Sequence, residues 1–346
     1  MGFFYTIMQK KTYCTEKKST TIIYFSSDKN YFHYLVGDRR TAIISSENIL
    51  KSYPEIFQGE NTIIINDDET HKNLATIDEI VSQLLQLGID RHSYIIGIGG
   101  GIVCDITGFV SHIYMRGVRF GLIPTTLLAM SDAAIGGKNG VNFGENKNTI
   151  GSFDNPDFII ADSSFVQTLT QEQYMSGLGE IIKYALIGNE KILNLLQGNQ
   201  AKILNRDSET IGKLVEESAH TKIEIVENDP LDTSIRHTLN FGHTIGHSIE
   251  ITENLPHGIA VVKGMNAAVD ISVKIGMLEN DKANFIKQLL TSFGYDISYK
   301  LNEKHIELLC HDKKKENFHI RFVLLEDIGK PVIKKMSIEQ IPALIG

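Results

Sequence analysis

The alternation of short apolar runs with helical stretches in the first half of the chain is the feature that most constrains its fold. The runs typical of β-strands are residues 21–25, 42–44, 62–65, 94–98, 120–123 and 158–161. Residues 76–87 have the apolar spacing of an α-helix. Such alternation is typical of βαβ units, so it predicts a mainly parallel sheet whose strands are buried on both faces.

The pattern becomes helical after residue 162. Thr170 and Gln173 have the spacing of a capping box, which predicts that a helix begins there. Helical spacing continues through residues 191–196, 211–226, 238–251 and 259–275, and a hairpin is expected at residues 321–334. For a chain of 346 residues this change predicts two domains, an α/β domain at 1–165 and a mainly α-helical domain at 166–346.

Composition excludes several classes of protein. The chain has 34 Lys and Arg against 42 Asp and Glu, a net charge of −8, which disfavours nucleic acid as a partner. An anionic ligand would therefore need a local cluster of cations. Cys14, Cys104 and Cys310 are far apart and odd in number, so we expect a reducing cytoplasm and no disulfide framework. The apolar runs are shorter than the roughly 20 residues that a membrane-spanning helix needs, so no membrane partner is expected.

A glycine cluster, residues 99–101, joins the strand at 94–98 to a helical pattern. Glycines at such a joint let a phosphate approach the backbone and the N-terminus of the helix. Ile102 breaks the dinucleotide fingerprint counted from Gly97, so the cluster alone indicates either a phosphate-binding turn of no assigned family or a tight turn that needs positive φ. Thr125 and Thr126 end another strand, where hydroxyl groups can face a ligand.

Two further groups of charged residues carry less specific signals. Glu69 and Lys72 follow a strand at i, i+3 spacing, which by itself is typical of a solvated charged turn. Lys138 and Lys147 lie in or near glycine-rich segments that follow Asp132, where lysine can meet a phosphate as a compact charge. These residues alone do not indicate a function, so they are interpreted together with the other motifs of the chain.

The second half contains a possible metal centre. Glu180 lies in a helical pattern, His243 and His247 are at i, i+4, and His257 follows. Glu180 with two of these histidines would leave one coordination position open, which is typical of catalytic zinc. A helical histidine pair with satisfied hydrogen bonds is the alternative. The HExxH pattern is absent because no glutamate follows His243.

Eight ordered segments between residues 69 and 314 resemble the 3-dehydroquinate synthase family of the sugar phosphate cyclases. The segments are GGGIVCDITGF, YMRGV, IPTTLLA, GGKNGVN, KNTIGSF, GLGEIIKYA, RHTLNFGHTIGH and HDKK. The resemblance implies a Rossmann-like, NAD-binding α/β domain and a helical, metal-binding C-terminal domain. It further implies a cytoplasmic homodimer that converts an anionic sugar phosphate, 3-deoxy-D-arabino-heptulosonate 7-phosphate, into 3-dehydroquinate and phosphate with catalytic NAD.

The resemblance also implies roles for individual residues. The positions that would hold NAD are Asp67, Glu69, Lys72, Gly100, Gly101, Ile102, Asp105, Thr125, Thr126, Lys138, Lys147, Phe165 and Thr168. The ligands of Zn²⁺, or of Co²⁺ in its place, would be Glu180, His243 and His257. The substrate-binding and catalytic positions would be Arg116, Asp132, Lys138, Asn148, Lys183, Lys222, Arg236, Asn240, His247 and Lys313.

Two departures from the family pattern lead to expectations of their own. Ser46 stands where the family has an acidic residue that contacts the adenosine ribose, although Glu47 is adjacent. The family's His-Gly-Glu is here His257-Gly258-Ile259, so a carboxylate that supports this metal ligand is expected to be missing.

The alternatives are a metal-dependent polyol or glycerol-phosphate dehydrogenase, a sister cyclase that makes a deoxy-inosose or valiolone product, and a non-catalytic descendant. The number of cations disfavours the first, because a small polyol does not need them. Arg236 and Asn240 disfavour the second, whose substrates lack a carboxylate. Retention of Glu180, His243 and His247 disfavours the third.

Overall fold

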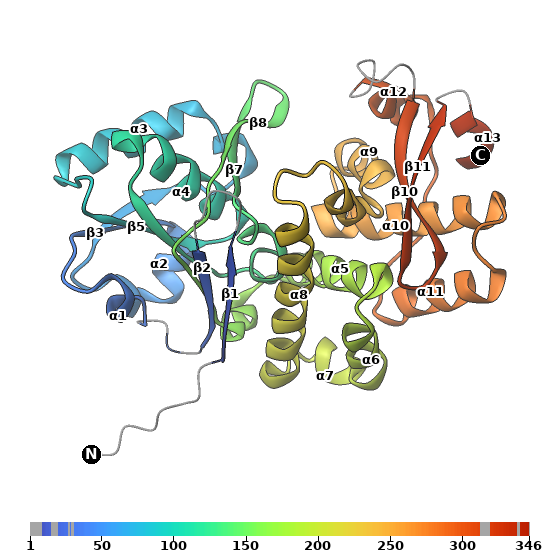
Figure 1. Cartoon of the computed structure of the whole chain (residues 1–346), viewed down its shortest axis with the longest axis horizontal. Coiled ribbons are helices and arrows are strands. Elements are labelled where there is room, and N and C mark those ends of the chain that lie inside the picture. Colours follow the sequence, from blue (N-terminus) through green and yellow to red (C-terminus); the bar gives the residue numbers. More distant parts are fainter. Residues whose placement is uncertain are drawn as a thin grey trace. The chain divides into compact units, whose positions relative to one another are not determined.

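The computed structural model describes residues 9–14, 20–26, 28, 31–311, 319–337 and 340–345. Contacts between Cα atoms divide the chain into two compact units, which Figure 1 shows. Unit 1 comprises Met1–Leu169 with Lys222–Leu231, and unit 2 comprises Thr170–Thr221 with Asp232–Gly346. The domain division at residue 165 stays a prediction, because units defined by contacts do not test where independently folding domains end.

Unit 1 is built on a seven-stranded sheet in the order β1-β2-β9-β6-β5-β3-β4. β1 pairs with β2 in antiparallel fashion, whereas the other neighbours are parallel. The strands are β1 (Gln9–Cys14), β2 (Thr20–Phe25), β3 (Thr41–Ser46), β4 (Asn61–Ile65), β5 (Tyr94–Gly99), β6 (Arg119–Pro124) and β9 (Phe158–Ala161). The predicted mainly parallel sheet is thus confirmed.

The central strands are apolar because helices cover the sheet. All residues of β3, β5 and β9 are buried. Helix α3 (Leu74–Gln86) begins at Asn73, whose side chain accepts hydrogen bonds from two backbone N–H groups of the first turn. Helix α4 (Gly101–Ile113) packs against α3, β5 and β6. These buried strands fix the sheet edge at which the predicted cofactor residues lie.

Unit 1 also contains short elements and a hairpin that was not predicted. The short elements are α1 (Phe32–Val36), α2 (Glu47–Ser52), η1 (Pro54–Phe57), η2 (Glu69–His71), η3 (Tyr114–Arg116), η4 (Ala129–Ala133) and η5 (Ser163–Thr168). Strands β7 (Lys138–Phe143) and β8 (Asn146–Phe153) form the hairpin, which extends away from the sheet (Figure 1). Its register shifts between Val141 and Phe143, because residues 147–149 of β8 bulge opposite the single residue Asn142.

Unit 2 is mainly helical, as predicted. Its helices are α5 (Gln171–Ile187), α6 (Glu190–Gly198), α7 (Gln200–Leu204), η6 (Ile235–Asn240), α9 (His243–Glu253), α10 (His257–Lys274), α11 (Asn280–Ser292), α12 (Glu303–His311) and α13 (Ile341–Ile345). Helix α8 (Ser208–Asn228) begins in unit 2, and its part from Lys222 onward belongs to unit 1. Thr170 and Gln173 form the predicted capping box. β10 (His319–Asp327) and β11 (Lys330–Ser337) form the predicted hairpin beside α10.

The helix predicted at residues 238–251 is interrupted at Gly242. That residue has φ 81°, in the left-handed region, and it separates η6 from α9. A side chain at Gly242 would place its Cβ atom 2.6 Å from the carbonyl oxygen of Val261. The close approach of α10 therefore requires glycine here, and the break makes His243 the first residue of α9.

Glycines also bring α5, α9 and α10 into backbone contact. A Cβ atom on Gly258 would lie 1.9 Å from the carbonyl oxygen of Ser176 in α5. A Cβ atom on Gly264 would lie 2.0 Å from the carbonyl oxygen of Gly242. Backbones this close draw the three helices together at the point where the candidate metal ligands stand.

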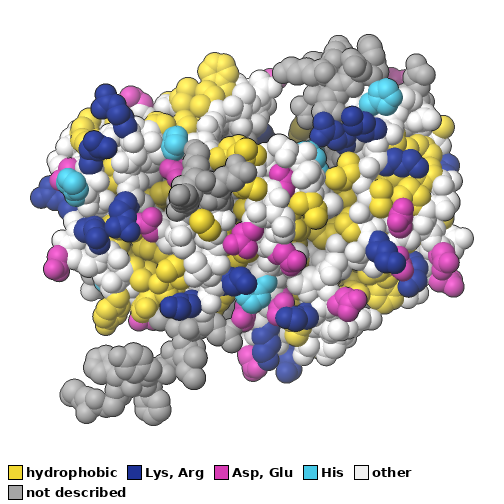
Figure 2. All heavy atoms as spheres, in the orientation of Figure 1, with side chains coloured by type: hydrophobic (Ala, Val, Ile, Leu, Met, Phe, Trp, Pro, Cys, Tyr) yellow, Lys and Arg dark blue, Asp and Glu magenta, His cyan; other side chains and the backbone are white. Residues whose placement is uncertain are grey.

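The surface of the described part of the chain is mixed in charge. On the face shown in Figure 2, Lys and Arg side chains are interspersed with Asp and Glu. None of the helices in the described part of the chain combines the length and apolar character that crossing a bilayer requires.

Candidate metal centre and cofactor site

Glu180, His243 and His257 come together inside unit 2. Oε1 of Glu180 lies 3.6 Å from Nε2 of His243 and 3.6 Å from Nε2 of His257. A tetrahedral zinc ion with bonds of about 2.0–2.2 Å holds its ligand atoms about 3.4 Å apart, so this spacing fits a metal ion with little movement. The Glu180 side chain is completely buried; its Oε2 is paired with the ammonium group of Lys183, and its Oε1 accepts no hydrogen bond from the described residues.

The other ring nitrogen of each histidine is held by an acceptor. Nδ1 of His243 donates to the backbone carbonyl of Phe241 at 3.2 Å, and Nδ1 of His257 donates to Oε2 of Glu250 at 2.8 Å. Because these acceptors bind the Nδ1 protons, the Nε2 lone pairs face Glu180 and are available to a metal. This arrangement is typical of metal-binding histidines.

Glu250 corrects one expectation from the sequence. The position after Gly258 holds Ile259, so a supporting carboxylate was expected to be missing. Glu250 supplies it from α9, seven residues before His257. Helical spacing places Glu250 seven residues after His243, on the same face, and this is the signal that could have identified it.

The two ligand histidines have opposite shifts in pKa. Burial lowers the pKa of His243 well below its usual value, and the nearby charge of Lys183 adds to this effect. Burial also acts to lower the pKa of His257, but the hydrogen bond to Glu250 and the charge of Glu180 outweigh it and raise that pKa. His243 is therefore neutral at pH 7, as a metal ligand must be.

His247 and Lys183 surround this centre. The His247 ring lies 5.3 Å from that of His243 and 5.6 Å from that of His257, and His247 is exposed. A nitrogen of each of the three histidines falls within 4.8 Å of the others. Lys183 is buried, and its ammonium group forms an ion pair with Oε2 of Glu180. The centre thus combines a carboxylate, three imidazoles and a buried cation.

The glycine cluster of unit 1 lies at the carboxyl edge of the sheet. Gly100 has φ −73°, so the alternative of a turn that needs positive φ is wrong. Space is the reason for glycine here, since a Cβ atom at Gly99 would lie 2.5 Å from Val103. A Cβ atom at Gly100 would lie 3.1 Å from the side chain of Thr126. The backbone at the N-terminus of α4 is therefore open to a phosphate.

Two buried hydroxyl groups flank this turn on neighbouring strands. Ser46 ends β3 and Thr125 follows β6, and the register places both ends level with Gly99. Neither hydroxyl has a hydrogen-bond partner among the described residues. Ser46 stands at the N-terminus of α2 without capping it, and Glu47 is exposed and paired with Lys51. Of Ser46 and Glu47, Ser46 is therefore the residue that is available to a ligand.

A hydrogen-bonded network joins several of the predicted cofactor residues. Lys72 is buried, and its Nζ donates to Asp105 and to Asn148, each at 2.5 Å. Burial raises the pKa of Asp105, although the pairing with Lys72 acts against this. Glu69 accepts a hydrogen bond from Asn142 at 2.8 Å. Asn142 was not predicted as a site residue, because its contact with Glu69, 73 residues earlier in the chain, is not visible in the local sequence.

The remaining predicted cofactor positions are distributed over unit 1. Asp67 is half-buried between β4 and η2, Ile102 is in the first turn of α4, and Lys138 and Lys147 are exposed on the β7–β8 hairpin. The Phe165 ring is buried and packs edge-on against Tyr53, with 4.8 Å between centroids. The Tyr53 hydroxyl also lies 3.1 Å from Oγ1 of Thr168.

The predicted substrate positions are divided between the units. In unit 1, Nζ of the largely buried Lys222 donates to the carbonyl oxygen of Asp132 at 2.7 Å and contacts its carboxylate. Arg116 is exposed and has φ 63°, between two other residues with positive φ. In unit 2, Arg236 is 3% exposed in η6. Lys313 lies outside the described residues.

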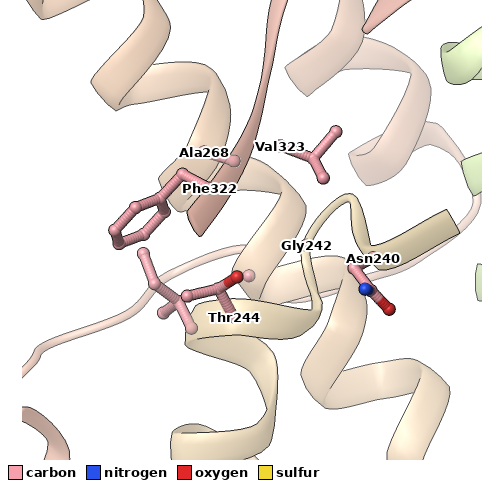
Figure 3. A pocket seen from close by; sticks show the side chains of 8 residues that line it. Asn240, Gly242, Thr244, Ala268, Phe322 and Val323 are labelled. Atoms are coloured by element: carbon pink, nitrogen blue, oxygen red, sulfur yellow. The ribbon is translucent and has the colours of Figure 1, made fainter. Parts of the chain in front are cut away.

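Asn240 lines a small apolar pocket behind α9, together with Phe322, Val323 and Ala268. Its amide points away from Phe322 (Figure 3). The pocket is too tight to admit a water molecule, so it is a packing defect and no substrate pocket.

Two solved structures share the fold of this chain. A solved 2-deoxy-scyllo-inosose synthase, in complex with carbaglucose-6-phosphate, NAD⁺ and Co²⁺, matches 97% of this chain and 99% of its own, with TM-score 0.87 and 23% identity. A 2-epi-5-epi-valiolone synthase from Streptomyces hygroscopicus with NAD⁺ and Zn²⁺ covers 99% of this chain and 98% of its own, with TM-score 0.84 and 22% identity. The chain therefore has the fold of the sugar phosphate cyclases.

The comparisons of sequence identify the family more specifically than the comparisons of structure do. Residues 62–176 match the N-terminal domain of 3-dehydroquinate synthase, and residues 177–315 match its C-terminal domain. The 3-dehydroquinate synthase of Dictyoglomus thermophilum is 40% identical over 288 residues, which are 82% of this chain and 81% of that protein. The chain belongs to the 3-dehydroquinate synthase family, and the resemblance of the sequence segments is confirmed.

Proposed function

We propose that this chain is a carbon–oxygen lyase that converts 3-deoxy-D-arabino-heptulosonate 7-phosphate into 3-dehydroquinate and phosphate, the second step of the shikimate pathway of aromatic amino acid biosynthesis. The observation that carries the proposal is the convergence of Glu180, His243 and His257 at ligand spacing in a member of this family. A polyol dehydrogenase fits less well, because the buried cations Lys183, Lys222 and Arg236 suit a substrate with a phosphate and a carboxylate.

Glu180, His243 and His257 would hold a divalent metal, zinc or cobalt. When bound, such a metal lowers the pKa of a substrate hydroxyl. His247 is exposed beside the ligands, so it can take or relay the proton of that hydroxyl at neutral pH. Lys183 would keep Glu180 in place through its second carboxylate oxygen.

The sheet edge of unit 1 would hold NAD. When bound, NAD accepts a hydride and later returns it. The open backbone at Gly100 and Gly101 would meet the pyrophosphate, and the hydroxyls of Ser46 and Thr125 would supply hydrogen bonds that the protein leaves unmade. Lys72, fixed by Asp105, would add a cation at this edge.

The substrate would be held by cations and amides. Arg236 offers a planar guanidinium that matches a carboxylate better than lysine would. Arg116, Lys138 and Lys222 are suited to the phosphate, and Asn148 to a hydroxyl or phosphate oxygen. Loss of the phosphate requires removal of a proton from the substrate. The phosphate oxygen itself can accept that proton, so no further protein base is needed for that step. Ring opening and aldol closure then need mainly a held conformation.

Phosphate release tests the proposal directly. The protein is incubated with the heptulosonate phosphate, NAD⁺ and Zn²⁺, and inorganic phosphate is measured. Stoichiometric release without net accumulation of NADH is expected. NADH formed from glycerol would instead identify a dehydrogenase. Phosphate released from glucose 6-phosphate, but not from the heptulosonate phosphate, would identify a sister cyclase.

We further propose zinc as the metal, a homodimer as the assembly and the cytoplasm as the location. The donor set of one carboxylate and two imidazoles suits zinc. Cys104 is a free, buried thiol, which suits a reducing compartment. Sedimentation of the purified protein tests the dimer, and elemental analysis of protein purified without added metal tests zinc.

A further inference from the structure

Asn142 occupies an irregular position in the β7–β8 hairpin. Val141 pairs with Ile150 and Phe143 pairs with Asn146, so Asn142 alone faces residues 147–149, and the bulge lies in β8 opposite Asn142. A bulge turns a side chain out of the normal alternation of a strand. Here Asn142 forms an isolated bridge with Asn73, and its backbone N–H donates to the carbonyl oxygen of Lys72 at 2.8 Å. Asn142 thus joins the hairpin to the segment that follows η2.

The Asn142 amide has partners on both sides. Its Nδ2 donates to Oε1 of Glu69 at 2.8 Å and to the carbonyl oxygen of Glu69 at 3.3 Å. Its Oδ1 accepts from the backbone N–H of Asn148 at 2.8 Å. An amide can donate to one partner and accept from another, whereas a carboxylate can only accept.

The contacts of Asn142 belong to a closed ring. Asn148 has φ 52°, a left-handed conformation that needs support, and its Oδ1 accepts a hydrogen bond from Lys72. Lys72 also donates to Asp105 of α4, so the ring is anchored to a helix that packs on the sheet. Movement of either Glu69 or Asn148 must therefore disturb Asn142.

From these contacts we propose that Asn142 is a positioning residue that couples the binding of the dinucleotide to the binding of the substrate. The proposal rests on the proposed function, in which Glu69 and Lys72 hold NAD and Asn148 meets the substrate. In this arrangement Asn142 acts through Glu69 and Asn148. It fixes the Asn148 backbone and the Glu69 carboxylate in one arrangement, so a ligand that orders one residue orders the other.

The test measures this coupling as a ratio of dissociation constants. The Kd of NAD⁺ is measured by calorimetry with zinc-loaded protein, without and with a saturating, non-reactive carbocyclic analogue of the heptulosonate phosphate. In the unaltered chain the analogue is expected to lower this Kd at least about fivefold, a typical coupling between two sites. In Asn142→Asp the ratio is expected to fall to about one, because a carboxylate at this position repels Glu69.

The hairpin provides a matched control. Asn146 lies on the same hairpin, and its Nδ2 reaches the carbonyl oxygen of Phe143 at 3.5 Å. Asn146→Asp makes the same chemical change without touching the ring, so it should keep the ratio of the unaltered chain. Asn142→Ser, which removes the amide without adding a charge, replaces Asn142→Asp if that variant does not fold, and it too should lower the ratio.

Three outcomes would overturn the inference. These are a ratio near one in the unaltered chain, an unchanged ratio in the Asn142 variants, and an equal fall in Asn146→Asp. Failure of the proposed function would be seen separately, because the unaltered chain would then release no phosphate from the heptulosonate phosphate itself.

Discussion

The carboxylate of Glu250 accepts the Nδ1 proton of His257 and so directs Nε2 of that ring toward Glu180. Replacing Glu250 by Gln keeps the size of the side chain but removes its charge and allows its amide to turn. We expect metal affinity to fall by about 10–100-fold, the usual effect of losing such a partner. Competition with a fluorescent chelator measures it.

Glu253→Gln is the control for Glu250, since Glu253 lies on the same helix and pairs with Lys263 at 3.8 Å. Its metal affinity should equal that of the unaltered chain. Equal affinities in both variants would show that Glu250 does not support the ligand.

Replacing Lys183 should change the stability of the metal-free protein. Its ammonium group is buried against the buried Glu180, so Lys183→Met would leave a carboxylate without its cation. In metal-free protein this should cost about 3 kcal/mol in the free energy of unfolding. The loss should be smaller with zinc bound, because the ion then compensates the carboxylate. Urea unfolding with chelator and with zinc provides the comparison.

Lys263→Met is the matched control, because Lys263 is largely buried and pairs with Asp296 and Glu253 away from the candidate ligands. Its cost in stability should not depend on zinc. If the cost of Lys183→Met is also independent of zinc, then Glu180 is not a metal ligand.

At this scale the sequence predicted residue types better than partnerships. Glu180 and His243 lie in specific family segments and His257 follows them outside those segments, and the structure brings the three predicted ligands together. Glu250 and Asn142 were missed. Glu250 acts across a turn between two helices, and Asn142 acts from a position opposite a bulge. Neither geometry is contained in local spacing.

At the level of elements, glycines allow α5, α9 and α10 to approach closely and so bring the candidate ligands together. Gly179, Gly242 and Gly258 are each adjacent in sequence to one of the three ligands. Gly258→Ala would push a Cβ atom to 1.9 Å from the backbone of Ser176. We expect it to cost about 3 kcal/mol or more in the free energy of unfolding. Metal affinity should fall as well, because His257 moves with its helix.

Gly198→Ala makes the same change at the end of α6, where no atom lies within 4 Å of the added Cβ. It should be neutral or stabilising by about 0.5 kcal/mol, since alanine restricts the unfolded chain. Urea unfolding and chelator competition are run on both variants. Comparable stability of the two would contradict the role given to close packing.

Periodicity predicted the larger elements but not their interruptions. Apolar spacing identified the parallel strands and most of the helices of unit 2, because burial on one or both faces imposes it. The break at Gly242 was missed, since the reason for it is a neighbouring backbone. Hairpin β7–β8 was missed because its strands contain many polar residues and lie outside the main sheet.

For the whole molecule, stability in acid should depend on carboxylates in both units. The hydroxyl of Thr70 and the ring of His71 lower the pKa of Asp68 to about 2, and the hydroxyl and N–H of Ser298, with Lys263, lower that of Asp296 to about 2. A lowered pKa in the folded state adds stability that is complete above about pH 4 and is lost as the pH falls toward 2.

The double variant Asp68→Asn and Asp296→Asn should therefore unfold with a weaker dependence on pH between 4 and 2 than the unaltered chain. Urea midpoints at closely spaced pH values measure this dependence. Identical pH profiles would show that these carboxylates do not contribute. A difference confined to pH above 5 would point to other groups.

Helix α8 has a consequence for how the chain is made. It passes from unit 2 to unit 1 at Lys222, so the backbone crosses between the units after residues 169, 221 and 231. A ribosome releases the N-terminus first, and Asp132 emerges 90 residues before Lys222, which contacts it. Unit 1 cannot be completed until residue 231 has emerged, when residues 170–221 of unit 2 are already outside. Folding during synthesis therefore cannot finish one unit before the other begins.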